Sequence, residues 1–256
     1  MAYGFYVLVF IFGLVLGSFI NVLISRLDKK GGLFFGRSEC PKCLTQLRWY
    51  DLIPIVSYIL LRGKCRYCRK DISIIYPVVE LTVGLIFVAY FIINQPSIGW
   101  LAIYELFTLL MLSSLIFFDL LYLIIPDKII ITIVSTSVLY SLLSRRSEVF
   151  GSLLSGFILA AFFATIYLIS KGEWLGLGDA KLALATGLIL GYPLSLFAVI
   201  ISIWTAALWG IGLLLLHKAG MKTALPFGSF LSVIIIIFII FHGQIQEQSQ
   251  FINLFL

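Results

Sequence analysis

The sequence contains little charge and only one polar stretch of any length. Asp, Glu, Lys and Arg make up 12% of its 256 residues, while 61% are hydrophobic and the mean hydropathy is +1.11. This composition lies far outside the range of soluble globular proteins. We therefore expect a multi-spanning membrane protein, with membrane lipids as neighbours and no nucleic-acid partner.

Histidine and cysteine are also scarce, and this limits the possible chemistry. The chain has two His residues and shows neither a Ser-His-Asp arrangement nor a His-Glu-x-x-His pattern, so a serine-type triad or a zinc metalloprotease site has no support. No glycine-rich loop follows a strand pattern to hold a nucleotide-like cofactor, which leaves the residues of any cofactor site unknown. All four Cys residues fall in one short region.

The hydrophobic residues are grouped into about eight segments, each a candidate transmembrane helix. The first, Ala2 to Ile24, lacks a basic start and a small-residue cleavage site, so we interpret it as a retained span rather than a signal peptide. The sixth is short and is either a half-helix or a part of the seventh. The sequence thus predicts an all-α polytopic membrane protein with spans at residues 4–25, 77–94, 98–118, 128–144, 150–170, 181–192, 194–216 and 227–242.

The basic residues predict the orientation, because cytoplasmic loops carry an excess of Lys and Arg. With the first long loop inside, 16 of the 18 basic residues lie on the cytoplasmic side and only Arg145 and Arg146 lie outside. The inner set is Arg26, Lys29, Lys30, Arg37, Lys42, Arg48, Arg62, Lys64, Arg66, Arg69, Lys70, Lys128, Lys171, Lys181, Lys218 and Lys222.

Two Cys-x-x-Cys pairs lie in the polar stretch 26–76, separated by 21 residues. This is the spacing of a four-cysteine zinc ribbon, and we predict that Cys40, Cys43, Cys65 and Cys68 bind a structural Zn²⁺. Disulfides are the alternative, which a reducing cytoplasm opposes. Four thiolate ligands leave no open coordination position on the metal, so we expect the metal to stabilise the folded loop rather than to take part in catalysis. The basic charge of the loop suits anionic lipid headgroups, although a solvated charged face would look the same.

Asp119 and Asp179 are the strongest catalytic candidates, since each lies at the end of an apolar segment and an ionisable side chain is costly there. The predicted orientation places both on the cytoplasmic face. Two carboxyl groups that share one proton can activate a water molecule and polarise a carbonyl group, as in aspartic proteases. Asp179 could instead be an N-cap, but Gly176 and Gly178 remove side chains beside it and would let a substrate backbone approach.

Other polar residues have simpler interpretations. Asp127 follows Pro126 and has the position of a structural helix N-cap. Asn21 and Glu80, within spans, either line the interior or satisfy a neighbouring helix. Glu105 is expected to reach the membrane interface.

The chain resembles the bacterial type IV prepilin peptidases, also called prepilin leader peptidase/N-methyltransferases, which carry the Gly-x-Gly-Asp signature of membrane aspartyl proteases. Ile20 and Leu52 stand where related sequences often have Leu and Asn. The stretches that carry the resemblance are Gly17 to Val22, Arg37 to Cys43, Leu47 to Pro54, Leu61 to Cys68, Tyr76 to Glu80, Asp119 to Asp127, Gly176 to Lys181 and Pro226 to Gly228.

The resemblance implies a bifunctional enzyme of the bacterial inner membrane that serves type IV pili, type II secretion or competence. Such enzymes cut the short basic leader of prepilins or pseudopilins after a glycine at the cytoplasmic face, and then methylate the new N-terminus with S-adenosylmethionine. The catalytic residues map onto Asp119 and Asp179, and the methyltransferase activity onto the loop at 26–76. The chain would then comprise a first helix (1–25), that loop, and a peptidase domain (77–256).

Two other functions are compatible with intramembrane carboxylates. One is a broader Gly-x-Gly-Asp protease without methyltransferase activity, which the cysteine loop and the extended motif match oppose. The other is a proton-coupled transporter, for which two similar halves would be typical; no repeat relates residues 1–116 to the remainder. The sequence makes no prediction of the oligomeric state.

Overall fold

The computed structural model describes residues 2–26, 37–97, 99–144, 149–218, 220 and 223–255, with the side chains of residue 2 and of residues 242–255 excepted. Within this part, the regular structure is helical apart from two isolated β-bridges, which confirms the predicted all-α class. The elements are α1 (Ala2–Arg26), η1 (Trp49–Leu52), α2 (Val56–Leu60), α3 (Ile75–Asn94), α4 (Trp100–Tyr122), α5 (Asp127–Ser144), α6 (Val149–Ser170), α7 (Leu177–Leu190), α8 (Leu194–Leu215) and α9 (Phe227–Phe255).

Six of the described helices are long and apolar enough to cross a membrane, namely α1, α3, α4, α5, α6 and α8. Each of the eight predicted spans coincides with a helix, and the short sixth one is α7, a separate helix of 14 residues. It does not merge with α8, because Gly191 has a positive φ of 66° and breaks the path between them. The protein is therefore a multi-pass membrane protein.

Two predicted boundaries were wrong in ways that affect the site. Helix α4 continues past residue 118 to Tyr122 and ends where Leu123 takes a left-handed conformation (φ 54°). Helix α7 begins at Leu177 rather than at residue 181, with Gly176 as its N-cap. Both catalytic candidates thus lie inside helices.

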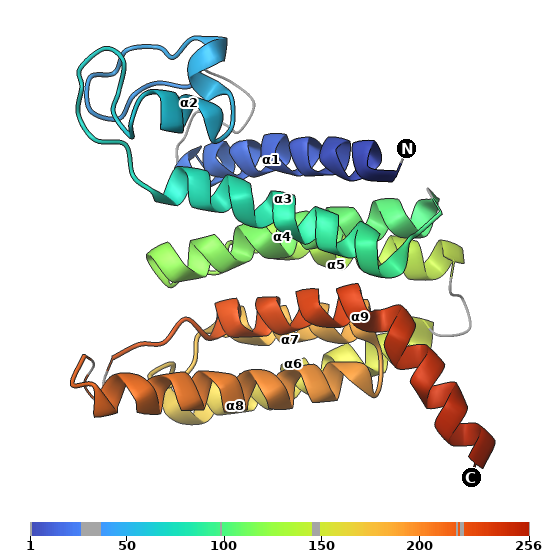
Figure 1. The fold of residues 1–256 in the computed structure, drawn as a ribbon. Coiled ribbons are helices and arrows are strands. Elements are labelled where there is room, and N and C mark those ends of the chain that lie inside the picture. Colours follow the sequence, from blue (N-terminus) through green and yellow to red (C-terminus); the bar gives the residue numbers. More distant parts are fainter. Residues whose placement is uncertain are drawn as a thin grey trace. The chain divides into compact units, whose positions relative to one another are not determined.

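The chain forms two compact units, Met1–Pro96 and Ser97–Leu256. In the first, α1 and α3 run side by side and in opposite directions, joined by the polar segment that contains η1 and α2 (Figure 1). Glycines permit this approach: a methyl group at Gly13 would lie 2.7 Å from the Cα of Gly84, and one at Gly17 would lie 2.6 Å from the Cα of Glu80. Small residues commonly allow such close packing of membrane helices.

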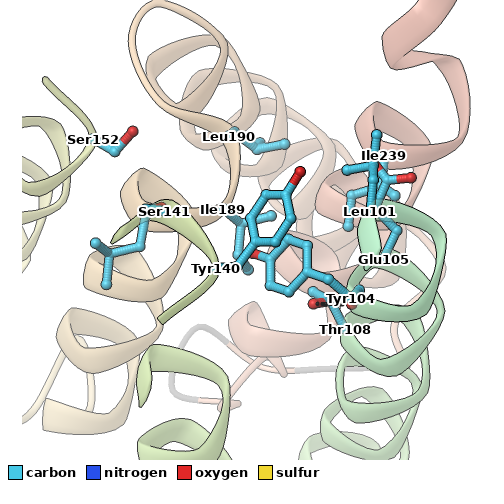
Figure 2. Close-up of a pocket in the computed structure, with 11 residues that line it drawn as sticks. Leu101, Tyr104, Glu105, Thr108, Tyr140, Ser141, Ser152, Ile189, Leu190 and Ile239 are labelled. Atoms are coloured by element: carbon cyan, nitrogen blue, oxygen red, sulfur yellow. Dashed lines mark hydrogen bonds between the residues drawn. The ribbon is translucent and has the colours of Figure 1, made fainter. Parts of the chain in front are cut away.

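The second unit contains α4 to α9. Helices α6 and α7 pack closely at Gly156 and Gly187, where an added side chain would clash with the facing backbone. Helices α4 and α5 are joined by the rings of Tyr104 and Tyr140 (Figure 2), which stack with centroids 4.2 Å apart. The Tyr104 hydroxyl also donates a 2.9 Å hydrogen bond to the Ser137 hydroxyl of α5. These rings and Glu105 line a small cavity of about 30 Å³.

The orientation in the membrane stays a prediction, as does the expectation that Glu105 reaches the interface. Five of the basic residues on which the orientation was based lie outside the described residues, namely Lys29, Lys30, Arg145, Arg146 and Lys222.

Candidate active site and metal site

The second unit contains a cavity of about 880 Å³ that both candidate aspartates line. Asp119 and Asp179 are 6% and 9% exposed, and their side chains border the same cavity. Much of the wall is apolar, with Phe162 and Phe163 among its residues. The structure therefore brings together the two residues that the sequence singled out, 60 positions apart.

Asp119 is held from the start of α9. Its Oδ2 accepts hydrogen bonds from the backbone N–H of Ser229 (2.6 Å) and from the Ser229 hydroxyl (3.0 Å). Gly228 makes this approach possible, since a methyl group there would lie 3.1 Å from the same carboxylate oxygen. The backbone of α9 thus fixes the position of this carboxyl group.

Asp179 is held by its own helix. It is the third residue of α7, and its Oδ2 accepts a 3.0 Å hydrogen bond from the backbone N–H of Gly176. The alternative role as N-cap is therefore wrong, because Gly176 occupies that position. A carboxylate in the first helical turn is stabilised by the unpaired backbone N–H groups and the helix dipole.

Ile125, in the turn after α4, packs against the glycines of two different helices. A methyl group at Gly178 would lie 3.0 Å from the Cβ of Ile125, and one at Gly228 would lie 2.7 Å from its Cδ1. Gly178 therefore has a packing role that the sequence did not reveal. By contrast, a methyl group at Gly176 would make only ordinary contacts, at 3.6 Å from the Asp179 carboxylate.

Within the described residues, every hydrogen bond to the two aspartates goes to Oδ2. This leaves Oδ1 of each carboxyl group for water and substrate. Ser229 and Ile125 are the components that the sequence did not predict. Ser229 donates to Asp119 through both its backbone N–H and its hydroxyl, but it lies 110 residues away in the chain, so nothing in the sequence indicated that the two residues meet.

Asp127 lies outside this cavity. It was expected to be an N-cap, but it is the first residue of α5, and its carboxylate forms a 2.6 Å ion pair with Lys181 of α7. Both side chains are exposed, so the pair contributes little to stability. Lys181 is the lysine nearest to Asp179 in sequence, and this ion pair engages it with Asp127 rather than with a candidate catalytic carboxylate.

The four cysteines of the first unit form one cluster. Their Sγ atoms all lie within 4.8 Å of one another, and those of Cys40 and Cys68 are 4.0 Å apart. A tetrahedral zinc site with Zn–S bonds of about 2.3 Å places its sulfurs about 3.8 Å apart. The cluster fits a metal ion of this kind, and the four residues could bind one.

The two Cys-x-x-Cys turns have the same backbone structure, 25 residues apart. In the first turn, Leu44 has φ 57° and donates its N–H to the carbonyl of Cys40 (2.8 Å). In the second, Arg69 has φ 56° and donates to the carbonyl of Cys65 (2.9 Å). Each turn is closed by an isolated β-bridge, Glu39 with Gln46 and Lys64 with Asp71. This duplicated turn points two thiols in each half toward the same point.

Hydrogen bonding differentiates the thiols. Bonds from the side chain and backbone of Thr45 lower the pKa of the Cys43 thiol to about 6, so this thiol is largely ionised at neutral pH. The backbone N–H of Lys70 acts in the same direction on Cys68, but burial and the neighbouring thiols outweigh it and raise the pKa of Cys68 to about 11. The thiolate is the form that binds metals.

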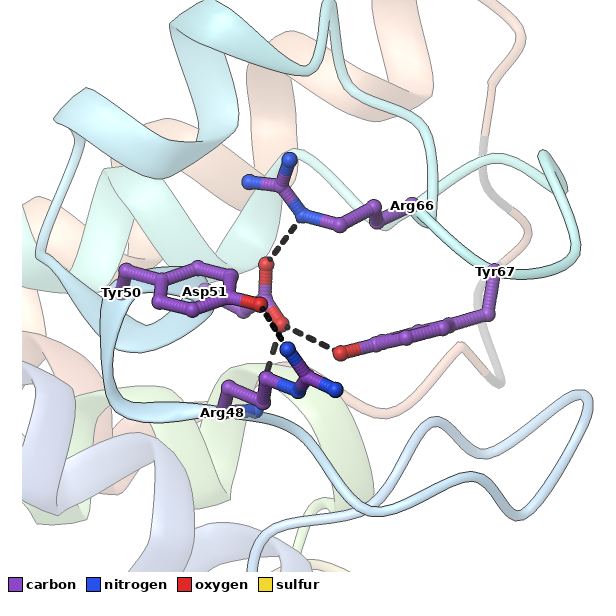
Figure 3. A network of polar contacts seen from close by, with 5 residues as sticks. All are labelled: Arg48, Tyr50, Asp51, Arg66 and Tyr67. Atoms are coloured by element: carbon purple, nitrogen blue, oxygen red, sulfur yellow. Dashed lines mark hydrogen bonds and ion pairs between the residues drawn. The ribbon is translucent and has the colours of Figure 1, made fainter.

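A second polar network joins η1 to the second cysteine turn (Figure 3). The Asp51 carboxylate accepts hydrogen bonds from Nε of Arg66 (2.7 Å), from the hydroxyl of Tyr67 (3.0 Å) and from the backbone N–H of Arg48 (3.2 Å). Burial alone would raise the pKa of Asp51, but these bonds outweigh it and the pKa lies below its ordinary value. The Arg66 guanidinium also lies 5.0 Å from the ring centroid of Tyr50.

The polar residues predicted within the first helices have partners inside the same unit. The side-chain amide of Asn21 donates to the carbonyl of Tyr76 (3.0 Å), so it satisfies the neighbouring helix, one of the two roles considered for it. The carboxylate of Glu80 accepts a 2.8 Å bond from the backbone N–H of Ile55.

Comparison with known proteins places these features in a family. Residues 11–93 match the model of the bacterial peptidase A24 N-terminal domain, and residues 106–211 match that of the type IV leader peptidase family. No solved structure matches the chain.

Several relatives carry the name prepilin leader peptidase/N-methyltransferase. The protein from Aeromonas hydrophila is 32% identical over 90% of this chain and 88% of its own. Those from Vibrio cholerae and Bacillus subtilis are 35% and 32% identical, over 75% and 86% of this chain and 79% and 88% of their own. The chain therefore belongs to the type IV leader peptidase family, and the predicted enzyme class, a prepilin leader peptidase and N-methyltransferase, is confirmed.

Proposed function

We propose that Asp119 and Asp179 are the catalytic pair with which this enzyme removes the leader peptide of type IV prepilins or pseudopilins. The observation that carries the proposal is that both carboxyl groups are buried and line one cavity large enough for a peptide segment. A backbone N–H holds one oxygen of each group: that of Ser229 binds Asp119, and that of Gly176 binds Asp179.

In the proposed mechanism the two groups share one proton. The ionised carboxylate takes a proton from a water molecule as the water oxygen attacks the scissile carbonyl carbon, and the protonated partner donates to the carbonyl oxygen. The peptide C–N bond of the resulting diol then breaks, the leaving nitrogen receives the proton that the first carboxylate took, and one diol hydroxyl returns a proton to the second carboxylate. Hydrogen bonds from Ser229 and Gly176 keep both groups oriented, so little reorganisation accompanies the reaction.

The cavity suits a basic leader attached to an apolar segment. Glu173, Asp119 and Asp179 line it, and none of the described Lys or Arg residues does. A cleft lined by one sign of charge concentrates substrates of the opposite sign. The apolar wall would accommodate hydrophobic residues near the cleavage site, and we propose that Gly176 and Gly178, which also line the cavity, admit the substrate backbone.

The metal at Cys40, Cys43, Cys65 and Cys68 is proposed to be Zn²⁺ with a structural role. Four thiolates fill a tetrahedral coordination sphere and leave no position for a substrate. Zinc would hold the two turns of the loop together, in a segment too small to form a large core of its own.

The methyltransferase activity is proposed to reside in the first unit. S-adenosylmethionine supplies a methyl group: the new terminal amine attacks the methyl carbon, the C–S bond breaks with its electron pair left on sulfur, and the amine loses a proton. We further propose the functional division into a first helix (1–25), a zinc-binding loop (26–76) and a peptidase domain (77–256). The enzyme would reside in the inner membrane with its peptidase site at the cytoplasmic face, as the distribution of basic residues indicates.

The test is to incubate the purified protein with a prepilin and S-adenosylmethionine and to determine the new N-terminus by mass spectrometry. Cleavage after the glycine and addition of one methyl group are expected. Cleavage without methylation would remove the methyltransferase half of the proposal, and no cleavage would remove the peptidase half.

A further inference from the structure

The first unit contains a cavity of its own, with a volume of about 340 Å³ and no lining residue in common with the aspartate cavity. Its lining comes from one end of α1, from the polar loop and from the first turns of α3. The volume lies within the range of small-molecule sites, which are mostly apolar with a few placed polar groups.

We infer that this cavity binds S-adenosylmethionine, with the Glu80 carboxylate as the anionic group that stabilises its sulfonium. The inference rests on the proposed methyltransferase activity and assigns it a location. Nothing in the family match identifies the residues that hold the methyl donor.

Glu80 is the first reason for this assignment. It is a carboxylate on an apolar helix, 8% exposed, and it lines the cavity. Its hydrogen-bond donor is the neutral backbone N–H of Ile55, and no ion pair to it occurs among the described residues. A buried carboxylate without a cationic partner favours a positively charged ligand, because charge pairs are strong where water is excluded.

The backbone at Ile55 is the second reason. This β-branched residue has φ 59°, an unfavourable conformation, and its N–H is bonded to Glu80. Strained residues persist only where the surrounding structure determines them, and they concentrate at binding sites. Here the strained residue holds, through its N–H, the Glu80 carboxylate that lines the cavity.

The remaining lining matches the other parts of the ligand. Leu47, Leu61 and Tyr58 offer an apolar and aromatic surface for a purine ring. Arg37 could pair with the ligand carboxylate. The Asn21 side-chain nitrogen donates to the Tyr76 carbonyl, and the side-chain oxygen can therefore accept a hydrogen bond from the ligand.

Two substitutions test the site by different physical effects. Glu80→Gln removes the charge but retains an oxygen that can accept the bond from Ile55, so the loop keeps its anchor. Ser57→Trp fills the cavity from α2. The matched control is Val56→Trp, because the adjacent Val56 is 49% exposed and does not line the cavity.

The measurement is equilibrium binding of labelled S-adenosylmethionine to the full-length protein in lipid nanodiscs, with metal content and prepilin cleavage measured on the same samples. Wild type and Val56→Trp should bind equally. Glu80→Gln should bind about tenfold more weakly or worse, the effect of losing one favourable charge interaction, and Ser57→Trp should show no binding. All variants should retain metal and cleavage.

Unchanged binding by Glu80→Gln, or by a Ser57→Trp protein that retains its metal, would overturn the assignment. If Ser57→Trp loses its metal, Glu80→Gln decides alone. If wild type neither binds the donor nor methylates a cleaved prepilin, the methyltransferase activity itself fails. If both variants methylate as wild type does, the activity stands and only the location is wrong.

Discussion

The cysteine loop and the aspartate cavity are assembled in opposite ways. The loop repeats one short turn, and each pair of ligands lies within four residues of the chain, so local backbone geometry fixes most of the metal site. The cavity is lined by Asp119 and Asp179 from two helices, and a third helix supplies Ser229, which binds Asp119; only packing brings the three together. The first site should therefore fail when a ligand is removed, and the second should also fail when its packing is disturbed.

The largest expected effect is the loss of cleavage on replacing either aspartate. Asp119→Asn and Asp179→Asn should each reduce prepilin cleavage by about 10³-fold or more, since members of a catalytic unit fail individually. Metal content should be unchanged. Cleavage by gel assay and methylation of an already cleaved prepilin are the measurements.

Methylation of the cleaved substrate should survive in both aspartate variants, because the two activities are assigned to different units. If a folded Asp119→Asn protein lost this methylation as well, the two sites would have to be one.

The second expected effect is loss of metal from the loop. Each Cys→Ser substitution should leave less than one zinc per chain and make the loop more susceptible to proteolysis, because coordination energy replaces a hydrophobic core there. Methylation should fall while cleavage continues near the wild-type rate. Metal analysis, limited proteolysis and the two activity assays provide the test.

Treatment of the wild type with a chelator should reproduce the cysteine variants. Wild-type protein that contains no zinc and whose thiols are paired as disulfides would reject the metal site. Loss of cleavage in the cysteine variants would mean that the peptidase depends on the loop.

The third effect concerns packing around Ile125. Gly178→Ala places a methyl group 3.0 Å from the Cβ of Ile125, so Ile125 or the start of α7 must shift by a few tenths of an ångström, and a shift of α7 moves Asp179. Because a displacement of about 1 Å can cost about 10²-fold in rate, we expect this smaller shift to reduce kcat by about three- to tenfold. The double variant Gly178→Ala/Ile125→Ala should recover part of the activity, because it removes the clashing side chain.

Gly178→Ala, Ile125→Ala and the double variant form a double-mutant cycle. Gly212→Ala is its control, since nothing lies within 4 Å of the added methyl group. The coupling energy between Gly178 and Ile125 is obtained from the kcat values of the two single variants and the double variant. If the double variant is no more active than Gly178→Ala alone, Gly178 acts by admitting substrate and not by packing.

The same contrast explains how far the sequence could predict each site. The spacing of the cysteines predicted the cluster because each Cys-x-x-Cys turn is local, and the Gly176–Asp179 signature and the apolar context of Asp119 identified the two carboxylates. The predicted end of α4 was wrong because residues 120–122 are as apolar as the helix before them. No change in residue type marks the true end, which is set by the left-handed backbone conformation of Leu123. Ser229 was missed because it lies 110 residues from Asp119 in the chain, and because one of its two hydrogen bonds to that carboxylate comes from the backbone N–H, which any residue but proline could provide.

The smallest expected effect tests electrostatic attraction at the mouth of the aspartate cavity. Glu173 is an exposed carboxylate that lines the cavity, whereas Asp127 is exposed in the same unit but lies outside it. Glu173→Gln should raise KM for a prepilin with a basic leader by about two- to fivefold at low ionic strength, with kcat unchanged, because peripheral charges act mainly on encounter. Asp127→Asn should leave KM near the wild-type value, although it removes the same charge. Since the Debye length falls to about 3 Å at 1 M salt, the KM difference between wild type and Glu173→Gln should shrink as salt is added. If it does not shrink, or if Asp127→Asn has the same effect, Glu173 does not attract the leader, and the affinity for basic leaders would have to come from Asp119 and Asp179.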